Sequence, residues 1–100
     1  MKPYVKIYFD AFGYHEGDFV PSEISEDEAV DIHHIVNRED HIENLMAVTR
    51  VEHDGFGDKT DYMAYLLKIH QRRLDLAGVP YDPKWFEFYI QKYEALAEKI

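Results

Sequence analysis

The sequence predicts a single α+β domain that ends in a two-helix hairpin. Apolar residues recur at helical spacing over about residues 59–76 and 82–98, whereas residues 29–36 combine β-branched types with the alternation of a strand. One hundred residues are enough for one hydrophobic core, and 46% of them are hydrophobic. We therefore treat residues 1–100 as one domain.

The segments around residues 29–36 are predicted from composition. Residues 3–9 are rich in β-branched and aromatic types, which predicts a short strand or extended segment. Residues 15–28 combine glycine, proline and serine with many acids, which predicts a loop. A polar loop over 37–43 leads to residues 44–48, a short apolar run that predicts either a strand or one helical turn.

Start and stop signals bound the helices. Thr49 is a plausible N-cap for a short helix that ends at Gly55 and Gly57. Asp58 or Thr60 is expected to cap the first helix of the hairpin.

Gly78 is expected to stop this first helix. Asp82 followed by Pro83 predicts the start of the second helix, since proline is favoured at the first helical position. We expect the hairpin to cover the region that carries the histidines.

Two adjacent histidines lie within the predicted strand. Successive strand side chains point to opposite faces, so His33 should share a face with Asp31, and His34 should lie on the other. Imidazole pairs are uncommon in protein cores, because each buried ring needs partners for both nitrogens. The pair therefore predicts either a functional site or a hydrogen-bonded polar patch. The histidines His15, His41 and His70 are expected to be solvated.

The charge of the chain is uneven. Residues 10–61 hold fifteen Asp and Glu against three Lys and Arg, a balance of −12, whereas residues 62–100 balance at +1. The half that holds the histidines should therefore repel a phosphate backbone unless a cation intervenes. No apolar run approaches eighteen residues and no basic leader precedes one, so we expect neither a membrane span nor a signal peptide.

Three ordered segments resemble the HNH endonuclease motif. These are Asp-Ile-His-His-Ile-Val-Asn-Arg at 31–38, Ile-Glu-Asn-Leu-Met-Ala-Val-Thr at 42–49, and Glu-His at 52–53. The resemblance covers about residues 20–58. It implies a ββα-metal core, also called a His-Me finger, which the predicted helical hairpin follows in the chain. It also implies an enzyme that hydrolyses DNA phosphodiester bonds in the cytoplasm of a bacterial or phage-infected cell.

The resemblance also implies a role for each matching residue. His33 matches a metal ligand, and His34 matches the general base that activates water. Asn44 matches the asparagine that keeps this base oriented, and His53 matches a second metal ligand. Arg38 follows the strand and is a candidate phosphate contact, with a solvated charge or an ion pair to Glu39 or Asp40 as the alternatives.

Two departures from the family pattern affect the expected metals. Many members hold a structural zinc with two Cys-x-x-Cys pairs, and the matching positions here are Ser22, Ser25, Thr49 and Glu52, so we predict no structural zinc. Gly57 stands where colicin-type members carry a further histidine. We therefore expect Mg²⁺ or Mn²⁺, with Ni²⁺ or Zn²⁺ as alternatives, and Asp54 or Asp58 could add a carboxylate.

Three functions follow as hypotheses. The first is a metal-dependent HNH endonuclease with weak intrinsic affinity for DNA. The second is a non-cleaving, acidic HNH-like protein that mimics nucleic acid or binds a protein partner. The third is a nuclease that acts only within a phage or bacterial protein complex. Nothing in the sequence predicts an oligomeric state.

Overall fold

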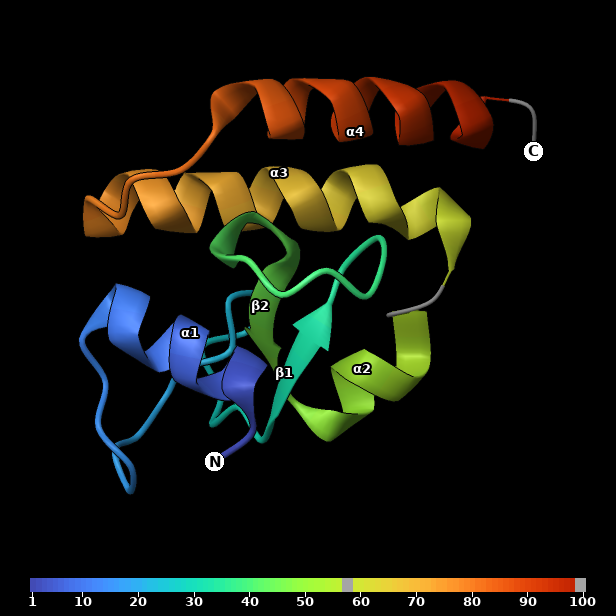
Figure 1. The fold of residues 1–100 in the computed structure, drawn as a ribbon. Coiled ribbons are helices and arrows are strands. Elements are labelled where there is room, and N and C mark those ends of the chain that lie inside the picture. Colours follow the sequence, from blue (N-terminus) through green and yellow to red (C-terminus); the bar gives the residue numbers. More distant parts are fainter. Residues whose placement is uncertain (57–58, 99–100) are drawn as a thin grey trace.

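The computed structural model describes residues 1–56 and 59–98 and has an α+β fold (Figure 1). Its elements are α1 (Pro3–Phe12), β1 (Asp31–His34), the 3₁₀ turn η1 (Ile42–Asn44), β2 (Leu45–Val48), α2 (Arg50–Phe56), α3 (Thr60–Ala77) and α4 (Pro83–Ala97). In Figure 1, α3 lies across one side of the strands, α4 lies beyond α3, and α1 and α2 flank the strands.

The N-terminal segment is a helix, so the strand predicted at residues 3–9 is wrong. Pro3 occupies the start of α1, and Gly13 ends it in the left-handed conformation, with its N–H bonded to the Phe9 carbonyl. The aromatic residues at positions 4, 8 and 12 lie one helical turn apart, and the rings of Tyr8 and Phe12 are 4.6 Å apart. Composition favoured a strand here, but the spacing of the apolar residues is helical.

The sheet is a two-stranded antiparallel pair whose second strand is fully buried. Asp31 pairs with Val48 and His34 with Leu45, which sets the register. Met46 and Val48 pack into the core beneath α3 and α4, whereas Leu45 and Ala47 pack toward α1. Burial on both faces explains why β2 is a continuous apolar run without alternation.

The last two helices form the predicted hairpin. Gly78 ends α3 with φ 68°, and Asp82 caps α4 by accepting the Lys84 N–H. The N-cap position of α3 is Lys59 and Thr60 is its first helical residue, so a Thr60 cap is wrong; Asp58 lies outside the described residues. No helix in the described part of the chain is long and apolar enough to cross a membrane.

Candidate functional site

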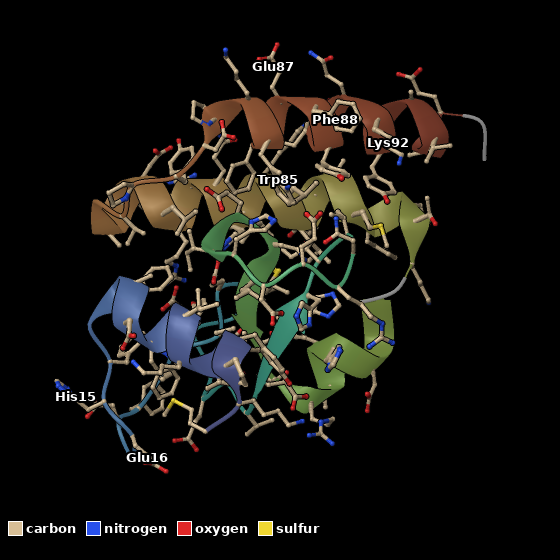
Figure 2. The ribbon with its side chains drawn as sticks, in the orientation of Figure 1. His15, Glu16, Trp85, Glu87, Phe88 and Lys92 are labelled. Atoms are coloured by element: carbon tan, nitrogen blue, oxygen red, sulfur yellow. The ribbon has the colours of Figure 1, made fainter. Side chains whose placement is uncertain are left out.

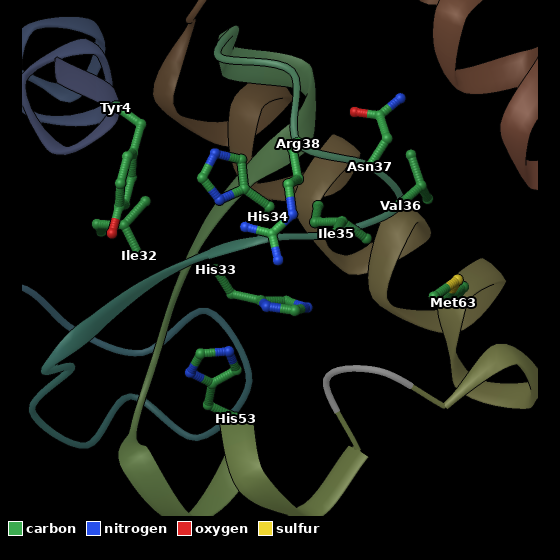
Figure 3. Close-up of a pocket in the computed structure, with 10 residues that line it drawn as sticks. All are labelled: Tyr4, Ile32, His33, His34, Ile35, Val36, Asn37, Arg38, His53 and Met63. Carbon is green, nitrogen blue, oxygen red and sulfur yellow. The ribbon is translucent and has the colours of Figure 1, made fainter.

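An open pocket of about 400 Å³ lies beside β1, the loop that follows it and α2 (Figure 3). Four of the predicted site residues contribute to its wall, namely His33, His34, Arg38 and His53. Asn44 is fully buried and is not part of the wall. The other wall residues are Tyr4, Ile32, Ile35, Val36, Asn37 and Met63.

His53 on α2 lies against His33 on β1. Their ring centroids are 4.7 Å apart, and His33 is almost fully buried. Nδ1 of His53 lies 3.1 Å from Oδ2 of Asp31. Because an ionised carboxylate only accepts hydrogen bonds, this contact places the proton of the neutral His53 ring on Nδ1 and leaves the lone pair on Nε2. A metal ligand needs such a lone pair.

Asp31 is itself held by Arg50. Nε and Nη2 of Arg50 donate to the two carboxylate oxygens at 2.7 and 2.8 Å, which is a bidentate pair. The hydrogen bonds from Arg50, and to a lesser degree the contact with His53, lower the pKa of the Asp31 carboxyl although partial burial opposes this. Asp31 thus stays ionised and connects the start of β1 to α2.

The Asp31 contacts are expected to make stability depend on pH in the acid range. Since its folded pKa is lowered, the stabilisation is fully present above the unfolded value of about 3.9 and is lost as pH falls through the folded value. Urea unfolding of the unmodified protein and of Asp31→Asn, followed from neutral to strongly acid pH, measures this. The variant should be less stable at neutral pH and should lose less stability on acidification, and parallel pH curves would contradict the assignment.

His34 faces the other side of β1, toward α1. Its Nε2 lies 2.7 Å from Oδ1 of Asp40, and its ring centroid lies 4.6 Å from that of Tyr4. The two adjacent histidines therefore point in different directions, as strand alternation predicts, and both still reach the pocket (Figure 3). His33 thus lies against His53 of α2, and His34 lies against Tyr4 of α1.

Asn44 fastens the loop between β1 and β2. Its Oδ1 accepts the Val36 N–H at 3.0 Å. Its Nδ2 donates to the carbonyl oxygens of Asn37 and Glu39 at 2.9 and 3.0 Å, and also to Oδ1 of Asn37. This loop carries Asp40, so one buried amide holds the segment that contacts the His34 ring. The geometry agrees with the bracing role that the resemblance implies for Asn44.

Arg38 lies on the pocket rim and is exposed. Within the described residues it forms no ion pair, whereas the neighbouring carboxylates of Glu39 and Asp40 contact His41 and His34. Arg38 is therefore not ion-paired with Glu39 or Asp40 in the described part of the chain, and both a solvated charge and a phosphate contact fit its exposed position. Its guanidinium group is available to a ligand in the pocket (Figure 3).

The four positions that match zinc-binding cysteines meet in one hydrogen-bonded cluster. Ser22 Oγ donates to Glu52 at 2.6 Å, and Ser25 also bonds to this carboxylate. Glu52 accepts the Thr49 N–H, while Thr49 Oγ accepts the Glu52 N–H, which is a capping box at the start of α2. The Thr49 cap is confirmed, and the cluster ties the loop at Ser22 to the helix that carries His53.

His33 and His53 could together hold a cation whose remaining ligands come from outside the protein. No group of three or more His, Cys, Asp or Glu side chains in residues 1–56 and 59–98 is arranged to hold a metal. The ring centroids of His33 and His53 are 4.7 Å apart, so the two imidazoles are neighbours on one side of the pocket. Asp54 is exposed and is not in the pocket wall, and Asp58 and Gly57 lie outside the described residues. Water and substrate oxygens would complete the shell.

Of the three histidines expected to be solvated, His70 is buried, His41 is partly exposed and His15 is exposed. His70 is fully buried, because it follows Leu66 and precedes Leu74 by one helical turn each on the inner face of α3. His41 bridges two carboxylates and lies against the Trp85 ring, 5.0 Å between centroids. His15 is exposed as expected.

Sequence reasoning assigned no role to Tyr4, Asp31 and Asp40. A signal existed for Asp31, since it lies two residues before His33 and so shares its face of the strand. Because residues 3–9 are predicted as a strand and not as a helix, the sequence does not predict that Tyr4 contacts His34. Asp40 lies in a loop, where no periodic pattern predicts the direction of a side chain.

Comparison with known proteins finds no relative of this chain. No protein-family model, curated protein or solved structure matches the chain.

Proposed function

We propose that this protein is a metal-dependent endonuclease of the HNH type that hydrolyses DNA phosphodiester bonds. The observation that carries the proposal is the arrangement of β1, β2 and α2, which brings His33, His34 and His53 to one pocket with Asn44 behind it. Two strands followed by a helix, with the histidines on the first strand and on the helix, is the order of a ββα-metal core. The meeting of the four cysteine-matching positions also supports the resemblance.

In the proposed reaction a water oxygen attacks phosphorus while the bond from phosphorus to the 3′ oxygen breaks. His34 accepts the proton of the attacking water and later returns it to solvent, and the departing 3′ oxygen takes a proton from solvent. The products are a 5′-phosphate and a 3′-hydroxyl. A divalent cation on His33 and His53 would stabilise the charge on the phosphate, and Arg38 would contact a non-bridging oxygen.

The charge around the pocket supports a phosphate substrate. The protein carries a net charge of −9, yet none of the ten described residues that line the pocket is acidic. The nearby carboxylates of Asp31 and Asp40 are bonded to Arg50, His53 and His34. Repulsion of the backbone by the acidic half is therefore weakest at the pocket, although net charge still favours low affinity.

The proposal predicts cleavage of DNA only in the presence of a divalent cation. Supercoiled and linear plasmid would be incubated with the protein in Mg²⁺, Mn²⁺, Ni²⁺ or Zn²⁺, with a chelator as the blank. Mn²⁺ is expected to support nicking better than Mg²⁺, because two imidazoles suit a transition metal better. In parallel, Mn²⁺ should broaden the NMR signals of His33 and His53.

A double variant, His33→Ala with His53→Ala, serves as the matched control for contaminating nuclease. It should lose both the cleavage and the Mn²⁺ broadening. Equal cleavage by the double variant would overturn the metal assignment. No cleavage by the unmodified protein in any of the four ions would overturn the proposed function.

A second candidate is a non-cleaving binding protein. The loop over 15–28 favours it, because its carboxylates at Glu16, Asp18, Asp27 and Glu28 are exposed. Such a surface attracts basic partner proteins. Tight binding to a basic nucleic-acid-binding protein without cleavage in any metal would favour this candidate. Cleavage that appears only when such a partner is added would favour a nuclease that works within a complex.

A further inference from the structure

Asp40 is the carboxylate that contacts the proposed general base. Its Oδ1 lies 2.7 Å from Nε2 of His34, a distance typical of a charge-assisted hydrogen bond. The side chains of His34 and Asp40 are 25% and 45% exposed, so the pair lies at the rim of the site, within reach of water and substrate. No step proposed above uses Asp40.

The contact determines which nitrogen of His34 can act as a base. A carboxylate accepts hydrogen bonds, so the ring nitrogen that faces it must carry the proton. In the neutral ring the proton is then on Nε2, and the lone pair that can take a proton from water is on Nδ1. Without a partner on either nitrogen, the ring would exchange between two tautomers and two orientations.

Three further contacts limit how the pair can move. The Tyr4 ring lies against the His34 ring, with 57° between their planes. Asn44 holds the loop beside Asp40 by accepting from Val36 and donating to the Glu39 carbonyl. The ring of His34 is thus held on one side by α1 and on the other by a fastened loop.

We infer that Asp40 is a positioning residue for His34, and that Nδ1 of His34, and not Nε2, accepts the proton of the attacking water. The inference rests on the proposed function for its catalytic part. The orientation and tautomer of the ring are properties of the protein alone. They can therefore be measured whether or not the protein cuts DNA.

The test combines nitrogen NMR with kinetics on Asp40→Asn. Asparagine keeps the size of the side chain, but its amide can donate as well as accept, so it no longer enforces one tautomer. In the unmodified protein, the ¹⁵N spectrum of neutral His34 should show the proton on Nε2. In Asp40→Asn it should show the other tautomer or a mixture. A proton on Nδ1 in the unmodified protein, or an unchanged spectrum in the variant, would overturn the inference.

The kinetic arm separates positioning from binding. Cleavage by Asp40→Asn should have a kcat lower by at least about 10- to 100-fold with little change in KM, which is the usual effect of losing a carboxylate that orients a functional histidine ring. Glu87→Gln is the control for the change in net charge, because Glu87 is exposed on α4 and points away from the body (Figure 2). Equal kcat values for the two variants would overturn the catalytic part. If the unmodified protein cuts nothing, the proposed function fails, and the nitrogen spectrum alone decides the role of Asp40.

Discussion

Replacing His34 by alanine is expected to lower the rate of metal-dependent DNA cleavage by about 100- to 10,000-fold, which is the usual contribution of a general base. The site then keeps its cation and its phosphate contact but has no group to take the proton from water. The measurement is the initial rate of plasmid nicking at saturating Mn²⁺. Metal binding should persist, because His33 lies against His53 of α2 on the side of β1 opposite to His34.

The matched control for this variant is His15→Ala. His15 is exposed on the loop after α1, so its loss should leave the nicking rate unchanged (Figure 2). The thermal unfolding midpoints of both variants should lie close to that of the unmodified protein, since His34 is partly exposed and fills no buried cavity. If both variants cut at the same rate, the base lies elsewhere.

The largest expected loss of stability comes from Glu23, whose carboxylate is buried between α1, β2 and α3. Its Oε2 accepts from the Tyr8 hydroxyl at 2.6 Å and from the Ala47 N–H at 3.2 Å. Its Oε1 lies 2.7 Å from Nδ1 of His70, whose Nε2 donates to the Ile42 carbonyl at 2.6 Å. Burial, together with the charge of Glu23, raises the pKa of the Tyr8 hydroxyl, which therefore stays protonated and acts as the donor.

Glu23→Ala removes the acceptor from three buried donors at once. We expect it to lower the free energy of unfolding by about 3–5 kcal/mol, as when one partner of a buried pair is removed. That is a large share of the total, about 5–15 kcal/mol, of a domain of this kind. Urea unfolding followed by circular dichroism measures the loss.

Glu16→Ala provides the comparison for the Glu23 variant, because it removes the same side chain from an exposed loop and should change stability by less than about 0.5 kcal/mol. Glu23→Gln should lie between the two, since its amide oxygen can still accept from the Tyr8 hydroxyl and the Ala47 N–H. Equal stabilities of the two alanine variants would show that the buried contacts contribute nothing net.

Local signals in the sequence predicted most of the elements. The caps at Thr49, Gly78 and Asp82 are short-range patterns and are confirmed, as are the α+β class and the C-terminal hairpin. Residues 3–9 form a helix against the strand that their composition predicts, because aromatic residues occur in both strands and buried helices and here their spacing is helical. Residues 44–48, for which a strand and a helical turn were both open, end in the strand β2.

The candidate site was only partly predictable, for a physical reason. Adjacent histidines on a strand can be placed on opposite faces from sequence alone, and the structure places them so. The partners of His34 could not be predicted. Asp40 reaches His34 through a loop whose path depends on buried Asn44, and Tyr4 arrives from a helix distant in sequence. These contacts join segments that are distant in sequence, so no periodic pattern along the chain predicts them.

The cluster around Glu52 has a consequence for how the protein responds to its surroundings. Burial opposes ionisation of Glu52, but hydrogen bonds from Ser22, Ser25 and Thr49 outweigh it and lower the pKa of this carboxyl. One anion thereby joins a loop to the helix of His53. The contact weakens as pH falls through the lowered pKa of Glu52, so acid loosens the connection between this loop and α2.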